Sequence, residues 1–199
     1  MDKNHFFYNL CTSLFFCCVF AMLMNFNTAY SGSYGTSTEG GKIACLKSDE
    51  GIDNLIAAKT DISKGITWGG LGQAIGPSAQ SDTDGMANTK AIVATLGKDS
   101  KYAALLCADY EIDDAGNTPC SAGAVCYRNW FLPARKQLDC VHEHRKEIGG
   151  FAEDFYWTST EFAGYPAYTS WDKYFGDGEH EPSSIDDFNK VRCVRLFNP

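Results

Sequence analysis

The sequence has little positive charge, with 17 Lys and Arg against 25 Asp and Glu and a formal net charge of −8. This balance disfavours generic binding to nucleic-acid backbones, which needs a basic surface. No Gly-X-Y repeat is present despite 19 glycines, so the chain contains no collagen stalk. A content of 44% hydrophobic and 14% aromatic residues excludes wholesale disorder. The 199 residues are therefore enough for one folded domain with an extra segment.

Signatures of common enzyme classes are also absent. The chain has no G-x-S-x-G nucleophile elbow, no phosphate-binding loop and no dinucleotide-binding glycine fingerprint. His142 and His144 are only two residues apart, so they do not share a helix face and do not predict a zinc-protease site. A carboxylate pair for glycoside hydrolysis leaves no sequence signature. We therefore predict a non-enzymatic protein, with a secreted hydrolase as the less favoured alternative.

Residues 1–31 predict a signal peptide. An uncharged apolar run spans residues 14–24, and the small residues Ala29 and Ser31 fit a signal-peptidase site. The alternative is an uncleaved membrane anchor over residues 6–26, a stretch roughly long enough to span a bilayer. Cleavage implies a secreted or cell-surface protein without a stable membrane span.

Six cysteines follow this segment, and an even number in an exported domain predicts three disulfides. They are Cys45, Cys107, Cys120, Cys126, Cys140 and Cys193. Cys120 and Cys126 are the simplest pair, because they close a short loop. For the others we expect Cys45 with Cys193, tying the two ends of the domain, and Cys107 with Cys140, joining two helices. The alternative is a set of buried free thiols.

The rest of the chain divides into a Gly/Ser-rich flexible lead-in at residues 32–40 and a folded domain at residues 41–199. Apolar spacing predicts two to three helices, over residues 87–96, 102–110 and 134–148. Strands are expected over residues 42–46, 55–58, 155–159, 170–175 and 191–197. Helices placed between early and late strands indicate a disulfide-stapled α+β fold with a mostly antiparallel sheet.

The order of several motifs resembles a known family. They are residues 40–43 (GGKI), 88–92 (NTKAI), 130–133 (WFLP), 148–151 (IGGF), 156–161 (YWTSTE) and 191–195 (VRCVR), with Trp171 and Phe175. In order and spacing they are similar to the Lcl C-terminal domain family, named for the Legionella collagen-like adhesin, over most of residues 40–197. The resemblance implies an exported bacterial domain with a C-type-lectin-like fold. In the name-giving adhesin this domain is a trimer that binds sulfated glycosaminoglycans, so a homo-oligomer is a further expectation.

A basic stretch interrupts the acidic composition. It contains Arg128, Arg135, Lys136, His142, Arg145 and Lys146. On a helix, Arg135, Asp139, His142 and Lys146 share one face. Such a face can bind a sulfate or a carboxylate through charge-assisted hydrogen bonds. The alternative is a solvated helix face whose cations pair with neighbouring acids.

The aromatic residues divide into a core set and a surface set. We expect Trp130 and Trp157 to pack in the core, because their large rings bury much apolar surface. Tyr165, Tyr168 and Trp171 lie in or beside a Gly/Pro loop and are expected at the surface, where they can stack on a sugar or line an interface. These three residues complete the predicted ligand site.

No metal or cofactor is predicted, although the acidic residues 177–181 offer oxygen ligands suited to calcium as a minor alternative. Arg192 and Arg195 lie three apart, and we expect a structural pairing with a carboxylate there. The predicted function is an exported, adhesin-like binding domain for an extracellular glycan or protein. The alternative from a different class is a structural or assembly module of the cell envelope.

Overall fold

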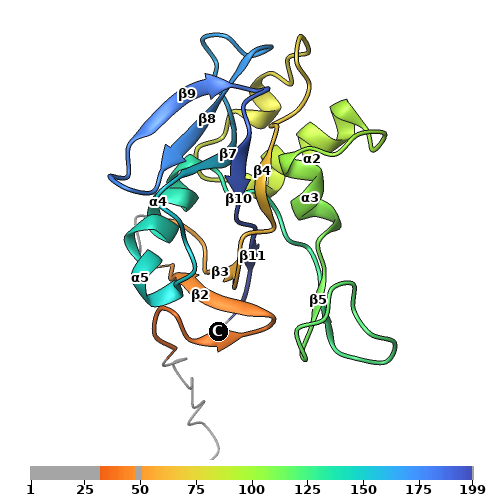
Figure 1. Cartoon of the computed structure of the whole chain (residues 1–199), viewed down its shortest axis with the longest axis vertical. Helices are drawn as coiled ribbons and strands as arrows, with labels where there is room; N and C mark the ends of the chain where they lie inside the picture. The colour runs from red at the N-terminus through yellow and green to blue at the C-terminus, as the bar shows by residue number, and fades with distance from the viewer. Residues whose placement is uncertain (1–31, 48–50, 199) are drawn as a thin grey trace, which may run out of the picture. The chain divides into compact units, whose positions relative to one another are not determined.

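The computed structural model describes residues 32–47 and 51–198. This part of the chain is α+β with mostly antiparallel sheets, as predicted (Figure 1). The predicted signal peptide at residues 1–31 lies outside the described residues. No helix in the described ranges is long and apolar enough to cross a membrane.

The larger sheet has five strands in the order β4-β10-β7-β8-β9. Their bounds are Ser63–Ile66 for β4, Phe155–Glu161 for β7, Thr169–Tyr174 for β8, His180–Ser184 for β9 and Asn189–Val191 for β10. Neighbouring strands are antiparallel except β10 and β7, which run parallel with Lys190 opposite Tyr156. The β8–β9 hairpin forms one edge of this sheet (Figure 1).

A second sheet has four strands in the order β1-β2-β3-β11. The strands are Ser37–Thr38, Gly41–Cys45, Leu55–Ala58 and Val194–Leu196. All four residues of β3 are buried, as expected for a strand covered on both faces. The predicted flexible lead-in contains β1, which pairs with β2 because Gly40 turns the chain back on itself with a φ of 82°.

The predicted strand over residues 191–197 is two strands in two different sheets. Strand β10 ends at Val191 and β11 begins at Val194. Between them Arg192 and Cys193 turn into the core, where Arg192 pairs with Asp61 and Cys193 forms a disulfide. This prediction was wrong because an apolar run does not show where a chain passes from one sheet to another.

The helices flank the sheets in two pairs (Figure 1). Helices α2 (Gly85–Leu96) and α3 (Ala103–Asp109) form one pair, and α4 (Arg135–Glu143) and α5 (Arg145–Ile148) form the other. A single helix was predicted over residues 134–148. The structure has two helices there, α4 and α5, because the chain leaves helical geometry at His144. The side chain of Asp84 accepts from the Ala87 N–H at 2.8 Å and caps α2.

The core contains the tryptophans predicted to lie there. Trp130 and Trp157 are buried, together with Trp68. Each indole N–H donates to a main-chain carbonyl, at 3.1 Å for Trp130, 2.8 Å for Trp157 and 2.9 Å for Trp68. These bonds satisfy the one polar atom of each ring, so the rings are buried without an unpaired donor.

Three disulfides join the six cysteines, and one pairing was predicted correctly. The pairs are Cys120–Cys126, Cys45–Cys140 and Cys107–Cys193. The predictions of Cys45 with Cys193 and of Cys107 with Cys140 were wrong. Cys45 ends β2, and α4 packs against that strand, which brings the Cα of Cys140 to 6.0 Å. Cys107 of α3 lies instead beside the β10–β11 junction, 5.4 Å from the Cα of Cys193.

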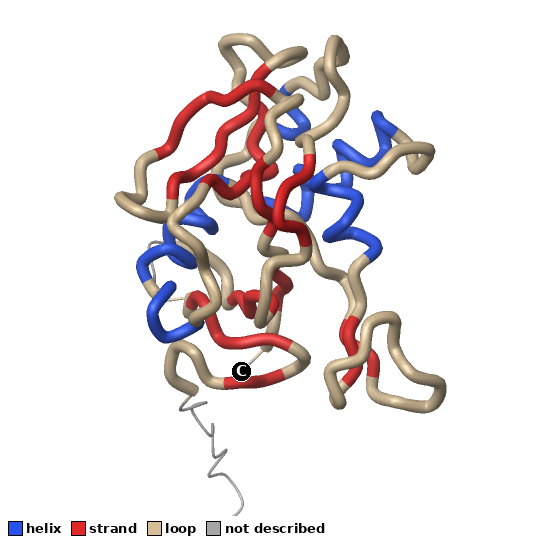
Figure 2. Tube along the Cα trace, in the orientation of Figure 1, coloured by secondary structure: helices blue, strands red, loops and turns tan. Residues whose placement is uncertain are grey.

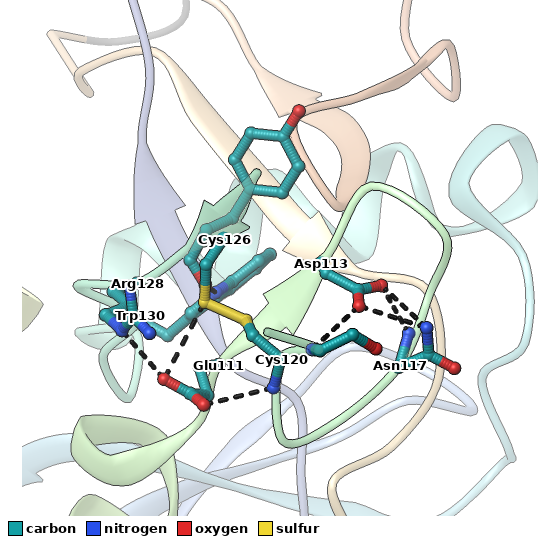
Figure 3. Close-up of a disulfide and its surroundings, with 9 residues drawn as sticks. Glu111, Asp113, Asn117, Cys120, Cys126, Arg128 and Trp130 are labelled. Carbon is teal, nitrogen blue, oxygen red and sulfur yellow. Dashed lines mark hydrogen bonds and ion pairs between the residues drawn. A yellow bond between two sulfur atoms is a disulfide. The ribbon is translucent and has the colours of Figure 1, made fainter. Parts of the chain in front are cut away.

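The Cys120–Cys126 disulfide closes a loop between β5 (Ile112–Asp113) and β6 (Cys126–Tyr127). Figure 3 shows that Asp113 organises this loop from within. Its carboxylate accepts from the Asn117 N–H at 2.7 Å and the Ser121 N–H at 3.0 Å. Hydrogen bonds from Asn117 and Ser121 lower the pKa of Asp113. The loop is therefore stabilised by its own polar groups.

Candidate functional site

The predicted basic stretch does not form a single patch. Arg128 lies beside the Cys120–Cys126 disulfide, where its Nε donates to Glu111 at 2.7 Å (Figure 3). Arg145 and Lys146 lie on α5, beyond the bend at His144. The Arg145 guanidinium is directed back to the carbonyl of His142 at 2.9 Å. Lys136 and Lys146 are exposed and pair with no acid in the described part of the chain.

One cation of the stretch does meet a predicted aromatic residue. Arg135 is the first residue of α4, and its guanidinium carbon lies 4.4 Å from the ring centroid of Trp171 on β8. The Nε of Arg135 is 3.4 Å from the Asp82 carboxylate, in an ion pair without hydrogen-bond geometry. The guanidinium donates no hydrogen bond to any described residue. Arg135 is thus held against Trp171 and Asp82, with its Nε buried and its Nη donors in no hydrogen bond to the described residues.

The loop between β7 and β8 carries the other predicted aromatic residues. Phe162 meets Trp171 edge-on, with ring centroids 5.1 Å apart. Tyr165 and Tyr168 stack on one another at 4.8 Å and are 58% and 44% exposed. Trp171 was predicted at the surface but is half-buried, because Arg135 covers its face and Phe162 its edge. The structure therefore joins Arg135, Trp171 and this loop into one region.

A second loop, residues 69–76, lies against the first at the same end of the five-stranded sheet (Figure 2). The Gly72 N–H donates to the Ala167 carbonyl at 2.9 Å. Glu161, the buried last residue of β7, accepts from the N–H groups of Ile75 at 2.6 Å and Gly76 at 2.7 Å. No local pattern indicates that Glu161 orders a loop about 85 residues earlier in the chain.

Asp139 and His142, two further residues of the predicted helix face, have partners within the fold. Asp139 accepts from Lys173 Nζ at 2.7 Å and His180 Nε2 at 2.6 Å. Burial raises the pKa of Asp139, but these two hydrogen bonds outweigh burial and hold the pKa at about 2. Burial lowers the pKa of His142, whose Nε2 lies 3.3 Å from the Phe175 carbonyl. These contacts support the structural interpretation of Asp139 and His142.

The acidic side chains of the candidate calcium loop, residues 177–181, do not form a group of three ligands around one point. Asp177 accepts from the Glu179 N–H at 3.0 Å. The one group of three potential metal ligands in the described residues is Glu111 with Cys120 and Cys126, where the two sulfurs are already joined. Glu111 also accepts from the Cys120 N–H at 3.0 Å (Figure 3). This cluster is a stabilised loop closure and does not fit a metal ion.

A separate cleft of about 650 Å³ lies between α2, α3 and residues 129–131. Its lining residues are Met86, Thr89, Lys90, Val93, Ala94, Ala108, Asn129, Trp130 and Phe131. None of them belonged to the ligand site predicted from the sequence. No local pattern marks such a cleft, because its walls come from two stretches of chain that meet only in the fold.

No protein-family model matches the chain, and no curated protein matches it significantly. Arg135, Trp171 and the two neighbouring loops are therefore the features from which a function can be inferred.

Proposed function

We propose that the chain is an exported, non-catalytic binding domain that recognises an extracellular glycan carrying acidic groups. Its fold would be the C-type-lectin-like fold of the Lcl C-terminal domain family. One observation carries the proposal: the guanidinium of Arg135 lies 4.4 Å over Trp171 and donates no hydrogen bond within the described residues. A second set of rings, Tyr165 and Tyr168, is exposed on the adjoining loop.

The chemistry of this pair suits an acidic sugar. A guanidinium offers planar N–H donors that match the oxygens of a carboxylate or a sulfate. Stacking on Trp171 restricts the side chain before binding, which reduces the entropy lost when a ligand is captured. Because the formal net charge is −8, long-range attraction of an anionic ligand is weak and short-range contacts decide affinity.

Export is supported by the three disulfides, because such bonds persist mainly in oxidising compartments. The motifs on which the family resemblance rests lie in elements that build the sheets and lead to the candidate site. Residues 156–161 form most of β7, and residues 191–195 form the crossing between the two larger sheets. Residues 130–133 lead directly into α4 and so position Arg135.

The test is binding of the full-length purified protein to a heparin oligosaccharide, a uronic-acid oligosaccharide and a neutral oligosaccharide, measured by calorimetry across a salt series. We expect binding of at least one acidic glycan. Arg135→Gln should weaken it about tenfold, as should Trp171→Ala, because each change removes half of the stacked pair. Lys64→Gln removes an exposed cation from the distant strand β4 and serves as the matched control.

The salt series adds a second criterion. A single guanidinium contact predicts a shallow salt dependence, in contrast to the steep dependence of a broad basic patch. Absence of binding to all three glycans, or equal binding by wild type and Arg135→Gln, would overturn the proposal.

The alternative of an assembly module is favoured by one further observation. Leu71 and Phe188 are 60% and 75% exposed, in addition to the two tyrosines. Exposed apolar groups of this kind occur at protein interfaces. Light scattering over a range of protein concentrations should then show self-association, and Tyr165→Ser with Tyr168→Ser should abolish it. A monomer at all concentrations would remove the support for self-assembly.

A further inference from the structure

The cleft between α2 and α3 has rigid walls. Thr89 Oγ1 accepts from the Leu132 N–H at 3.1 Å and donates to the Leu132 carbonyl at 3.4 Å. These two bonds fix α2 to the segment that leads into α4. Phe131 and Val194 exchange two main-chain hydrogen bonds, of 2.8 and 2.9 Å. The cleft therefore exists before any ligand arrives, and a ligand need not order its walls.

The lining of the cleft is mostly apolar. The apolar side chains are Met86, Val93, Ala94, Ala108, Trp130 and Phe131. A volume of about 650 Å³ falls in the range of small-molecule sites, which are lined mainly by apolar groups with a few polar ones. Met86 is partly exposed, and its flexible thioether can adapt to the shape of an occupant.

Besides Thr89, whose hydroxyl is bonded to Leu132, two polar side chains lie among the lining residues, from different walls. Lys90 is exposed on α2 and pairs with no acid among the described residues. Asn129 is exposed on the facing segment and adopts a left-handed backbone conformation, with a φ of 63°. In a chain with eight more acidic than basic residues, an unpaired lysine beside an apolar cleft is complementary to an anionic head group.

We infer that this cleft binds a small amphipathic carboxylate, an aliphatic or aromatic acid whose apolar body lies against Met86 and Val93. Its carboxylate would accept a charge-assisted hydrogen bond from Lys90 Nζ, and Asn129 would donate a second one. This site shares no lining residue with the Arg135–Trp171 region, so the inference stands or falls independently of the proposed function.

The experiment uses octanoate and octan-1-ol as a matched pair of probes, which differ in the head group alone. Each is titrated into the full-length ¹⁵N-labelled protein and followed by amide chemical-shift changes. We expect saturable octanoate shifts at residues 86–94 and 129–131, and weaker binding of octan-1-ol. Lys90→Gln should weaken octanoate binding about fivefold and leave octan-1-ol binding unchanged.

Two further variants separate the cleft from the rest of the surface. Ala94→Trp places an indole into the cleft from an exposed helix position, and it should abolish binding of both probes. Lys101→Gln removes an exposed lysine outside the cleft and should change neither. Octanoate shifts centred on Tyr165 and Tyr168, unaltered octanoate affinity in Lys90→Gln, or no saturation up to millimolar octanoate would each overturn the inference.

Discussion

Arg192 and Asp61 form an ion pair in which the arginine side chain has no exposed surface. The Nε and Nη2 atoms of Arg192 lie 2.9 and 2.7 Å from the same Asp61 oxygen. The remaining donors reach the carbonyls of Ala58 at 3.0 Å and Gly150 at 2.6 Å. One guanidinium therefore joins the end of β3, the chain after α5 and the crossing between the two sheets.

Asp61→Asn should destabilise the protein by about 3–5 kcal/mol, because it leaves a fully buried guanidinium without its counter-ion. The free energy of unfolding from urea titration at neutral pH measures this loss. Arg128→Gln is the control, since it removes a partly exposed pair with Glu111 and should cost less than about 1 kcal/mol. Equal losses in the two variants would contradict a structural role for Arg192.

The local features of the fold were the predictable ones. The three helical segments, the strand at residues 55–58 and the burial of Trp130 and Trp157 follow from apolar spacing within short windows. The structural role expected of Arg192 is confirmed by its ion pair with Asp61. The role was predictable because a buried arginine needs a carboxylate partner. Strand β9 was missed, since its sequence HEPSS lacks the apolar alternation of a strand.

The relationships between distant segments were not predictable. Two of the three disulfide pairings were wrong, because pairing depends on which helix packs on which strand. Arg135 and Trp171 were both candidates, but helix periodicity grouped Arg135 with His142 and Lys146 instead. The bend at His144 and the packing of α4 on β8 replaced that grouping with the contact to Trp171.

Removing the Cys107–Cys193 disulfide should cost more stability than removing Cys120–Cys126. The first bond spans 86 residues and the second spans 6, and a longer closed loop restricts the unfolded chain more. Double serine variants should lose about 4–5 and about 2 kcal/mol respectively, as measured by urea denaturation without reductant. Similar losses for both would show that strain or burial, and not loop length, determines the contribution.

The same bonds make a prediction about thiol chemistry. Mass spectrometry after alkylation without reductant should find none of the six cysteines modified. With increasing reductant, Cys120 and Cys126 should be alkylated first, because they are half-buried while the cysteines of the other two pairs are buried. Early labelling of Cys107 or Cys193 would contradict this order.

Glu161→Gln tests whether the buried carboxylate orders the loop at residues 69–76. The carboxylate accepts three hydrogen bonds, from Ile75 N, Gly76 N and Gln80 Nε2. The substitution replaces one of the two accepting oxygens by an NH₂ group, so that a donor faces a donor. The loss of stability should be roughly 1–3 kcal/mol. Hydrogen exchange should speed up at Ile75 and Gly76. Unchanged exchange at both amides would show that the loop is ordered without Glu161.

Asp172 gives the protein a pH dependence of the opposite sign to that of Asp139. Burial raises the pKa of Asp172 to about 6, and the Glu181 charge on the neighbouring strand acts in the same direction. Hydrogen bonds from Ser183 and Asn189 oppose this rise without cancelling it. Between the unfolded pKa near 4 and the folded pKa near 6, the folded state binds more protons, so stability falls as pH rises.

Asp172→Asn should therefore gain stability relative to wild type as the pH rises from 4.5 to 7.5, by roughly 1–3 kcal/mol. The substituted amide keeps an oxygen to accept the Asn189 Nδ2 hydrogen bond, which is 2.6 Å long. Urea denaturation at several pH values measures the difference. Asp53→Asn removes an exposed carboxylate and controls for the change in net charge. A difference between Asp172→Asn and wild type that stayed constant with pH would contradict a raised pKa of Asp172 in the folded protein. The hydrogen-bond partners of the carboxylate would then be sufficient to keep it ionised despite its burial.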